Sequence, residues 1–473
     1  MERRLAVSCA TALVLLRSVA FVFGDSPPFD ADQAIFGLMA KHMSELRAFS
    51  AFPYGQSYIL AVDAWLAAPL FYLAGPSVTA LKLPILAINL TVTLLLLRSL
   101  DRELGLRPLV ALVPALFFIL PPIPTADLLL QACGGNAAPF LYVLLLWLLR
   151  RRPLIFGAVL AFGFVNREFT AYGLGALLLI EATNGPRAIR QSLQDKLLAG
   201  VSASAVFSVV RVLGSVGNPA GPGTTAASVA YPDQLQVFVG TSCWTIAGIP
   251  TWLTQMFSSH LGHLYSGGAR WLWLTLGLTA LGCLARLVFL ACRGIAGRRQ
   301  GWQFPAYISL VGLLAALVPA VARCGFIHAR YVLLALFLLA GITALYLSME
   351  RNTRLKAVVI SVVLLWAAVN AVDHVRYAAA RHASPPDPRK VLIDHLLSND
   401  IRFAVSDYWT AYHVTFLSEE EVIVAPSDFV RIHQYQDVLR SHDDAVRIGL
   451  APCDGGQEVA GFHVCPPPAA RTR

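Results

Sequence analysis

Charge is what this chain has least of. Only 14% of its 473 residues are charged, whereas an average soluble protein carries roughly 25%. Hydrophobic residues make up 56% of the chain. This composition excludes an ordinary water-soluble protein, and many apolar runs approach the roughly 20 residues that a helix needs to cross a bilayer. The chain is therefore predicted to be an α-helical polytopic membrane protein.

The hydropathy criterion predicts about eleven spans. Clusters of Lys and Arg occur at every second junction, and the loops between them are poorer in both. The positive-inside rule places these clusters and the N-terminus in the cytoplasm, and the C-terminal tail outside the inner or plasma membrane. The net charge of +9 is thus a signal of topology, and no nucleic-acid partner is expected. The predicted spans are 5–23, 79–98, 108–122, 137–150, 153–166, 168–182, 197–216, 270–292, 303–322, 331–349 and 357–373.

The first apolar segment carries an arginine. A cleaved signal peptide is one interpretation of this segment, but Arg17 interrupts the apolar stretch and no clear cleavage site follows. We favour an uncleaved first helix. A charged residue inside the membrane is costly, so we expect Arg17 either to extend to the interface or to face a cavity.

Cysteine is too scarce, at eight residues, for a disulfide framework. Cys9, Cys283 and Cys292 lie in predicted membrane helices. Cys453 and Cys465 lie in the external tail, where oxidation is permitted. We expect these two cysteines to pair.

Residues 24–78 form an external loop that opens with two carboxylates in "FDADQAIFGLMA". Apolar side chains recur with helical spacing over 31–47, which predicts an amphipathic helix on the membrane surface. Asp30 followed by Gln33 resembles a capping box. That pairing does not explain Asp32, although acids in a first helical turn are favoured by the helix dipole. A second surface helix is predicted around Asp63, which needs a partner in its apolar surroundings.

These features resemble the GT-C class of glycosyltransferases, which includes protein O-mannosyltransferases and the lipid A aminoarabinose transferase. The resemblance rests on "DADQAIFGLMA", "YGQSY", "LKLP" entering the second span, and "HARYVLLALFLLAG" at 328–341, and it covers the chain to about residue 350. Many members carry Asp-Glu where this chain has Asp32-Gln33. That difference leaves open whether Asp30 substitutes for the missing acid or only caps the helix.

The resemblance implies a sugar donor linked to a polyprenyl phosphate, and a glycan, lipid or protein acceptor. Asp32 is the candidate general base, since a positioned base contributes roughly 10²–10⁴-fold, and Asp30 is a second catalytic candidate. Cations must stabilise the departing phosphate. No cofactor and no metal site are predicted, although a divalent ion is not excluded. The candidate substrate-binding residues are Asp63, Tyr54, Gln56, Arg167, Arg330, Tyr331 and His328.

Arg167 and Arg330 are the two arginines among these candidates, and the sequence around each bears on whether it binds phosphate. Arg167 lies in a tight external turn beside Glu168, so a local ion pair is the alternative to phosphate binding. Arg330 and His328 lie with Arg323 in another turn on the outer side, where the positive-inside rule predicts few cations. Function is the better explanation for Arg330.

Two parts make up the expected organisation. Residues 1–375 form the membrane module, with external loops at 24–78 and 217–269. His260 and His263 in the second loop have no carboxylate or thiol nearby, so they predict no metal site. Residues 385–468 alternate between helical and strand patterns and predict a small extracytoplasmic α/β domain. It is close to the minimum size for independent stability, so it is expected to lean on the membrane module.

Two other functions remain open from the sequence. A transporter or flippase also keeps charges in its spans, but such proteins often show internal repeats, and none is evident here. A non-catalytic membrane scaffold is the third possibility, because of the Asp32-Gln33 departure.

Overall fold

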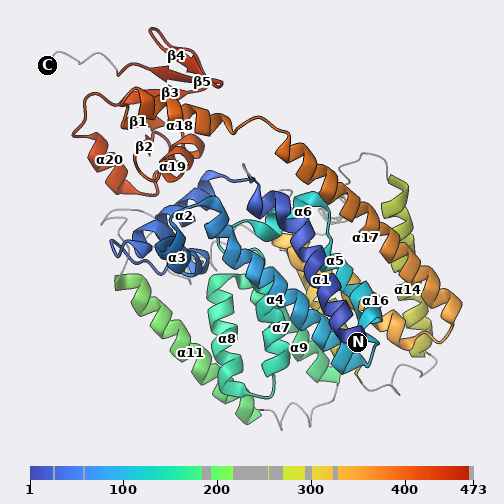
Figure 1. The fold of residues 1–473 in the computed structure, drawn as a ribbon. Coiled ribbons are helices and arrows are strands. Elements are labelled where there is room, and N and C mark those ends of the chain that lie inside the picture. Colours follow the sequence, from blue (N-terminus) through green and yellow to red (C-terminus); the bar gives the residue numbers. More distant parts are fainter. Residues whose placement is uncertain are drawn as a thin grey trace.

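A bundle of helices and a small α/β domain make up the computed structural model (Figure 1). It describes residues 1–24, 27–56, 59–183, 193–216, 254, 270–292, 301–322 and 329–467. The predicted loop 217–269 therefore lies almost entirely outside the described residues. The bundle contains α1 (Glu2–Ser18), η1 (Val19–Phe23), α2 (Ala31–Ser44), α3 (Val62–Ala74), α4 (Val78–Leu104), α5 (Pro108–Ile119), α6 (Ile123–Leu130), α7 (Ala138–Leu149), α8 (Pro153–Asn166), η2 (Glu168–Thr170), α9 (Ala171–Thr183), α11 (Leu193–Val216), α14 (Arg270–Cys292), α15 (Gln303–Ala322), η6 (Ala329–Ala335), α16 (Leu336–Met349) and α17 (Thr353–His382).

Every predicted span coincides with helix, but the helices differ in length. Among the described residues, five helices are long and apolar enough to cross a membrane, or six if α5 and α6 are one broken span. Helices α7, α8 and α9 have only 12, 14 and 13 residues, or about 18–21 Å at roughly 1.5 Å per residue. The chain is an integral membrane protein in which short helices pack among long ones.

A sharp break separates α5 from α6, which meet at 82°. Its cause is local, because Pro121 and Pro122 follow α5 directly and cannot continue it. Backbone carbonyls freed at membrane depth must find donors within the protein. His374 Nε2 contacts the Pro121 carbonyl at 2.8 Å, and Asn89 donates to the Leu129 carbonyl at 2.9 Å.

Arg17 belongs to the same network, and neither expectation for it is correct. Its side chain is enclosed by protein, with 1% exposed. The guanidinium donates to the Phe118 carbonyl and to Asn89 Oδ1, and it lies 5.2 Å from the centre of the Phe118 ring. Arg17 is buried because the broken helix offers it acceptors that an unbroken helix would lack.

The described helix ends that carry basic clusters, at the start of α1, the end of α4, the α7–α8 turn and the α16–α17 turn, lie away from the C-terminal sheet, as does the N-terminus (Figure 1). Arg3 contacts Asp101 at 3.8 Å, and Arg150 contacts Glu103 at 3.7 Å. These pairs bring together three of the predicted basic clusters, which lie at 3–4, 98–107 and 150–152. The opposite end of the bundle (the domain end) holds α2, α3 and the candidate site residues.

The C-terminal part forms a five-stranded mixed sheet with the order β2-β1-β3-β5-β4. Strands β2, β1 and β3 are parallel, whereas β5 is antiparallel to β3 and β4. The predicted helices and first two strands are present, and the predicted disulfide between Cys453 and Cys465 is confirmed. The elements are α18 (Pro388–Ser398), β1 (Phe403–Ser406), α19 (Tyr408–Leu417), β2 (Ile423–Pro426), α20 (His433–Leu439), β3 (Val446–Gly449), β4 (Gln457–Val459) and β5 (Phe462–Cys465).

Replacing Arg17 with Met is expected to destabilise the bundle, because the Phe118 carbonyl and Asn89 Oδ1 lose their donor. Interhelical hydrogen bonds in membranes contribute ~0.6–1.7 kcal/mol each, so the loss of two predicts about 1–3 kcal/mol. Thermal unfolding of the purified protein in detergent measures this. Arg3→Met on the same helix is the control, since the Arg3 side chain is 56% exposed and exposed pairs contribute about 0–1 kcal/mol. Equal stability of the two variants would contradict the role of Arg17.

Candidate functional site

Helix α2 begins at the two carboxylates that the sequence singles out. Asp30 is its N-cap, because its Oδ1 accepts a hydrogen bond of 2.9 Å from the Gln33 backbone N–H. The Gln33 side chain also interacts with the Asp30 carboxyl, and its Oε1 accepts from the Ala132 backbone N–H at 3.3 Å. Burial raises the pKa of the Asp30 carboxyl above its ordinary value, although the hydrogen bond from Gln33 lowers it. The expectation that Asp30 caps the helix is confirmed.

Asp32 is the second residue of α2, in its first turn, and is half-buried. The hydroxyl of Tyr408 donates to its Oδ1 at 2.6 Å. Tyr408 is the first residue of α19, so the contact joins residues 376 positions apart in the sequence. The side chain of the candidate base therefore lies at the junction of the bundle and the α/β domain.

Helix α2 is not the two-faced surface helix that the sequence predicts. Every residue from Gln33 to His42 is buried, because α3 packs on one side and α19 covers another. Gly37 marks the closest approach: a Cβ atom there would lie 2.4 Å from the Phe416 ring. The α/β domain is thus part of the same core as α2, as its small size requires.

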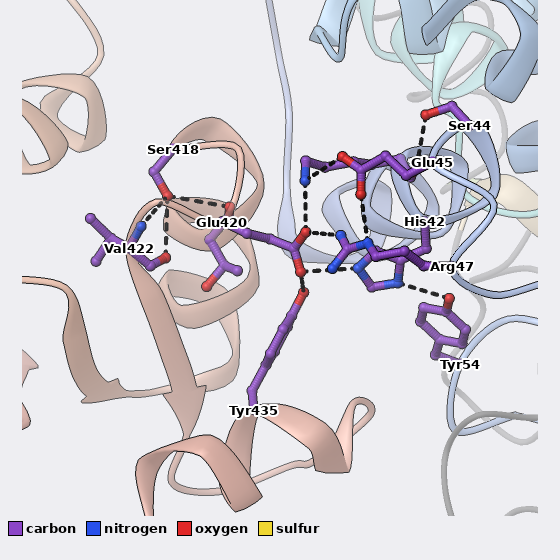
Figure 2. Close-up of polar contacts among 11 residues, drawn as sticks. His42, Ser44, Glu45, Arg47, Tyr54, Ser418, Glu420, Val422 and Tyr435 are labelled. Atoms are coloured by element: carbon purple, nitrogen blue, oxygen red, sulfur yellow. Dashed lines mark hydrogen bonds and ion pairs between the residues drawn. The ribbon is translucent and has the colours of Figure 1, made fainter. Parts of the chain in front are cut away.

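Glu420 anchors the α/β domain to α2 (Figure 2). Its carboxylate accepts from Lys41 Nζ at 2.8 Å, His42 Nε2 at 3.0 Å, Tyr435 at 2.8 Å and the Arg47 guanidinium. Burial raises the pKa of Glu420, but the hydrogen bonds from His42 and Lys41 outweigh it, and the pKa lies below its ordinary value. The carboxylate therefore stays ionised and offsets the buried cations of α2.

Tyr54 and Gln56 also contribute to this junction. The Tyr54 hydroxyl lies 2.9 Å from His42 Nδ1. Arg431 of the α/β domain donates to the Gly55 carbonyl at 3.0 Å, and the amide oxygen of Gln56, oriented towards it, accepts from both terminal nitrogens at 2.7 and 3.0 Å. The "YGQSY" segment therefore contacts the α/β domain through residues predicted to bind substrate.

The loop 131–136, which follows α6, gathers further predicted site residues. Asp63 is fully buried, and its Oδ2 accepts from the backbone N–H groups of Gly134 and Gly135 at 2.9 and 3.0 Å. Arg167 donates to the carbonyls of Cys133 and Gly134. Both glycines have positive φ, at 88° and 77°, a conformation that other residues rarely adopt. The loop is thus held by two side chains of opposite charge: Asp63 binds its backbone N–H groups, and Arg167 binds its carbonyls.

Arg167 does not form the local ion pair with Glu168 that was the alternative to phosphate binding. Its side chain is 5% exposed and bonds to the loop, whereas the neighbouring Glu168 is exposed. The partner that Asp63 needs in its apolar surroundings is likewise supplied by backbone N–H groups, with Arg167 as a more distant charge. Neither set of contacts was visible in the sequence, because residues 131–136 carry no charge.

Arg330 and Tyr331 lie in η6 at the same end of the bundle. The Arg330 guanidinium is 5.3 Å from the centre of the Tyr331 ring, and it interacts electrostatically with Asp32 and Cys133. Cys133 in turn lies within electrostatic range of Asp30, Asp63 and Arg167. The structure therefore brings the predicted acids and arginines together around loop 131–136. His328 lies outside the described residues.

Lys82 and Asp127 are charged neighbours of this site that the sequence analysis did not assign to it. Lys82 is fully buried in the first turns of α4 and donates to the Pro28 carbonyl. It interacts electrostatically with Asp127 of α6 and with Asp30. Its position in the "LKLP" segment was the feature of the sequence that could have pointed to a role in the site. A lysine at the end of a span, however, more often anchors at the membrane interface. Within the described residues, no group of three or more His, Cys, Asp or Glu is arranged to hold a metal.

The bundle of long and short apolar helices, with an α/β domain over one end, is similar in fold to solved structures. Crystal structures of ArnT from Cupriavidus metallidurans superimpose over nearly the whole length. The apo form gives a TM-score of 0.64 at 9% identity and covers 98% of each chain. The form bound to undecaprenyl phosphate gives 0.65 at 10% identity, over 99% of this chain and 98% of that one.

An Archaeoglobus fulgidus oligosaccharyltransferase is a more distant match. Its apo crystal structure gives a TM-score of 0.53 at 12% identity and covers 94% of this chain and 69% of that one. No protein-family model and no curated protein sequence matches the chain. The predicted fold is confirmed, and the similarity is one of fold without similarity of sequence.

Replacing Glu420 with Gln is expected to weaken attachment of the α/β domain, because a neutral amide cannot offset Lys41 and Arg47. Breaking a buried ion pair costs about 3–5 kcal/mol, and we expect about 3 kcal/mol because Arg47 is half-exposed. The wild-type contribution is complete above the ordinary Glu pKa of about 4.3 and is lost only as the pH falls through the lower folded-state pKa. Thermal unfolding between pH 7 and pH 3 measures both effects.

The neighbouring Glu421→Gln is the matched control. Its carboxylate is 64% exposed and pairs with Arg402 inside the α/β domain. Similar unfolding curves for the two variants would show that Glu420 does not anchor the domain.

Proposed function

We propose that this protein is a membrane glycosyltransferase that moves a sugar from a polyprenyl-phosphate carrier to an acceptor outside the cytoplasm. The observation that carries the proposal is that Arg330 lies within electrostatic range of Asp32, and Lys82 within range of Asp30, at the domain end of a GT-C fold. These residues come from three distant segments and supply two acids and two cations. Undecaprenyl phosphate is bound in one of the similar ArnT structures, which supports a lipid-linked donor.

The proposed reaction needs one base and positive charge. An acceptor hydroxyl or amine attacks the anomeric carbon, and a bond forms between the acceptor heteroatom and that carbon. The bond from the anomeric carbon to the phosphate oxygen breaks, and the carrier phosphate leaves with the electron pair. Asp32 takes the acceptor proton, while Arg330 and Lys82 stabilise the charge that develops on the phosphate.

The other predicted residues receive different roles in this proposal. Asp63 and Arg167 bind the backbone of loop 131–136, so they determine the shape of the site without contacting the substrate. Tyr54 and Gln56 hold the α/β domain against it. Asp30 caps α2 and contributes a second negative charge near Lys82.

The proposed orientation follows from charge. The basic clusters lie at the end of the bundle away from the α/β domain, and the positive-inside rule assigns that end to the cytoplasm. The N-terminus is then cytoplasmic, and the site and the α/β domain face the outside of the inner or plasma membrane. A glycan, a lipid or a protein at that surface is the acceptor.

Asp32→Asn is expected to lower the rate of sugar transfer by about 10²–10⁴-fold, the usual contribution of a positioned base. Donor binding should be unchanged, because Asn has the same shape as Asp and because Asp32 makes no contact with the donor phosphate in this proposal. Release of the carrier from a panel of polyprenyl-phosphate sugars by purified protein measures the rate. Transfer at the wild-type rate would reject Asp32 as the base, and counterflow of substrate across proteoliposomes without a glycosidic product would favour a transporter.

Arg330→Ala is expected to slow transfer by about 10²–10³-fold, as removal of one group that stabilises developing charge does in other enzymes. Arg330→Lys keeps the positive charge and should recover part of the rate, whereas a loss of packing alone would not depend on charge. Transfer is measured as a function of donor concentration. An Arg330→Ala protein with unchanged dependence on the donor would exclude a role at the phosphate.

A further inference from the structure

The α/β domain reaches the candidate base through a single side chain. The hydroxyl of Tyr408 lies 2.6 Å from Asp32 Oδ1. Tyr408 is the hydrogen-bond partner of this carboxylate within the part of the chain that the structure describes. A separate domain thus supplies a contact to the residue on which the proposed chemistry depends.

The position of the hydroxyl is determined by several independent contacts. The Tyr408 backbone N–H donates to Asp428 at 2.8 Å, and its side chain is almost completely buried. Its ring packs edge-on against Trp409 and Tyr412, each with centroids 5.2 Å apart, and lies 5.7 Å from Phe429. A ring enclosed in this way has little rotational freedom, which is the condition for holding a second group in place.

Packing alone does not account for the hydroxyl. A phenylalanine would fill the same aromatic pocket without placing a polar group beside a carboxylate. Burial, followed by the charge of Asp32, raises the pKa of Tyr408 above its ordinary value. The hydroxyl therefore stays protonated at neutral pH and acts as a donor to the carboxylate.

We propose that Tyr408 of the α/β domain is a positioning residue for Asp32 of the membrane bundle. This inference rests on the proposed function. The Tyr408 O–H holds Oδ1 of Asp32 and leaves Oδ2 for the proton of the acceptor. The proton passes from acceptor to Oδ2, and Tyr408 keeps its own proton throughout.

The anchor at Glu420 has a second consequence in this arrangement. It fixes the α/β domain against α2 about three turns of helix beyond Asp32, at roughly 3.6 residues per turn. The Arg431 contact to Gly55 adds another fixed point. Between these contacts the domain has little freedom to shift, so Tyr408 meets Asp32 in one geometry.

The test compares Tyr408→Phe with Tyr435→Phe in the full-length protein. Both variants remove one hydroxyl from the junction, but Tyr435 donates to Glu420 at 2.8 Å and does not contact Asp32. For Tyr408→Phe we expect kcat to fall about tenfold, in line with the loss of one hydrogen bond to a charged group, with KM for the donor unchanged. Tyr435→Phe should lower thermal stability and leave kcat close to wild type, because Lys41, His42 and Arg47 still bind the Glu420 carboxylate and keep the domain in place.

A double variant separates positioning from a structural effect. In the Asp32→Asn background, followed over long incubations with excess enzyme, Tyr408→Phe should cause no further loss, because there is no carboxylate left to position. Equal losses of kcat in Tyr408→Phe and Tyr435→Phe, or an additive loss in the double variant, would overturn the inference. An active wild type, an inactive Asp32→Asn and an unaffected Tyr408→Phe would reject the role of Tyr408 while the proposed function stands. A wild type that transfers no sugar from any donor would reject both.

Discussion

The burial of α2 beneath the α/β domain is the constraint on which the candidate site depends. A helix that carries Lys41 and His42 cannot be covered on both sides unless a negative charge meets them, because desolvated cations are costly. Glu420 supplies that charge, and its own desolvation is offset by the three basic side chains that surround it. With the domain fixed in this way, Asp32 lies in a protein-lined junction and contacts Tyr408. Without it, α2 would be an ordinary interfacial helix with two carboxylates in water.

A second constraint operates inside the bundle. The break between α5 and α6 frees the carbonyls of Phe118 and Pro121, which Arg17 and His374 contact, while Asn89 binds the Leu129 carbonyl near the C-terminal end of α6. The same break directs the chain into loop 131–136, whose backbone then binds Asp63 and Arg167. Buried polar groups in the bundle and the shape of the site are therefore two results of one local interruption. This explains how charged residues in an apolar chain can be structural while others nearby remain available for chemistry.

Identity of 9–12% with structures of the same fold shows how little of such a fold depends on particular residues. Apolar length, prolines at breaks and basic residues at one end are properties that many sequences share. They were sufficient to predict all eleven helical segments and the polytopic class. The predicted segments 137–150, 153–166 and 168–182 match α7, α8 and the pair η2–α9 to within one residue, and each is shorter than the roughly 20 residues that a span needs.

The sequence by itself determined the local features: the N-cap at Asp30, the helix and strand order of the tail, and the pairing of Cys453 with Cys465. These depend on neighbouring residues or on cellular compartment, and both can be read along the chain. Only the tertiary structure decided the partners of Asp32, Arg167 and Arg17, and the covering of α2. Those partners are backbone groups and side chains up to several hundred residues away. Every residue has a backbone carbonyl, so the sequence does not indicate which carbonyl an arginine will bind. For the same reason the contacts of Tyr54 to His42 and of Gln56 to Arg431 became visible only in three dimensions.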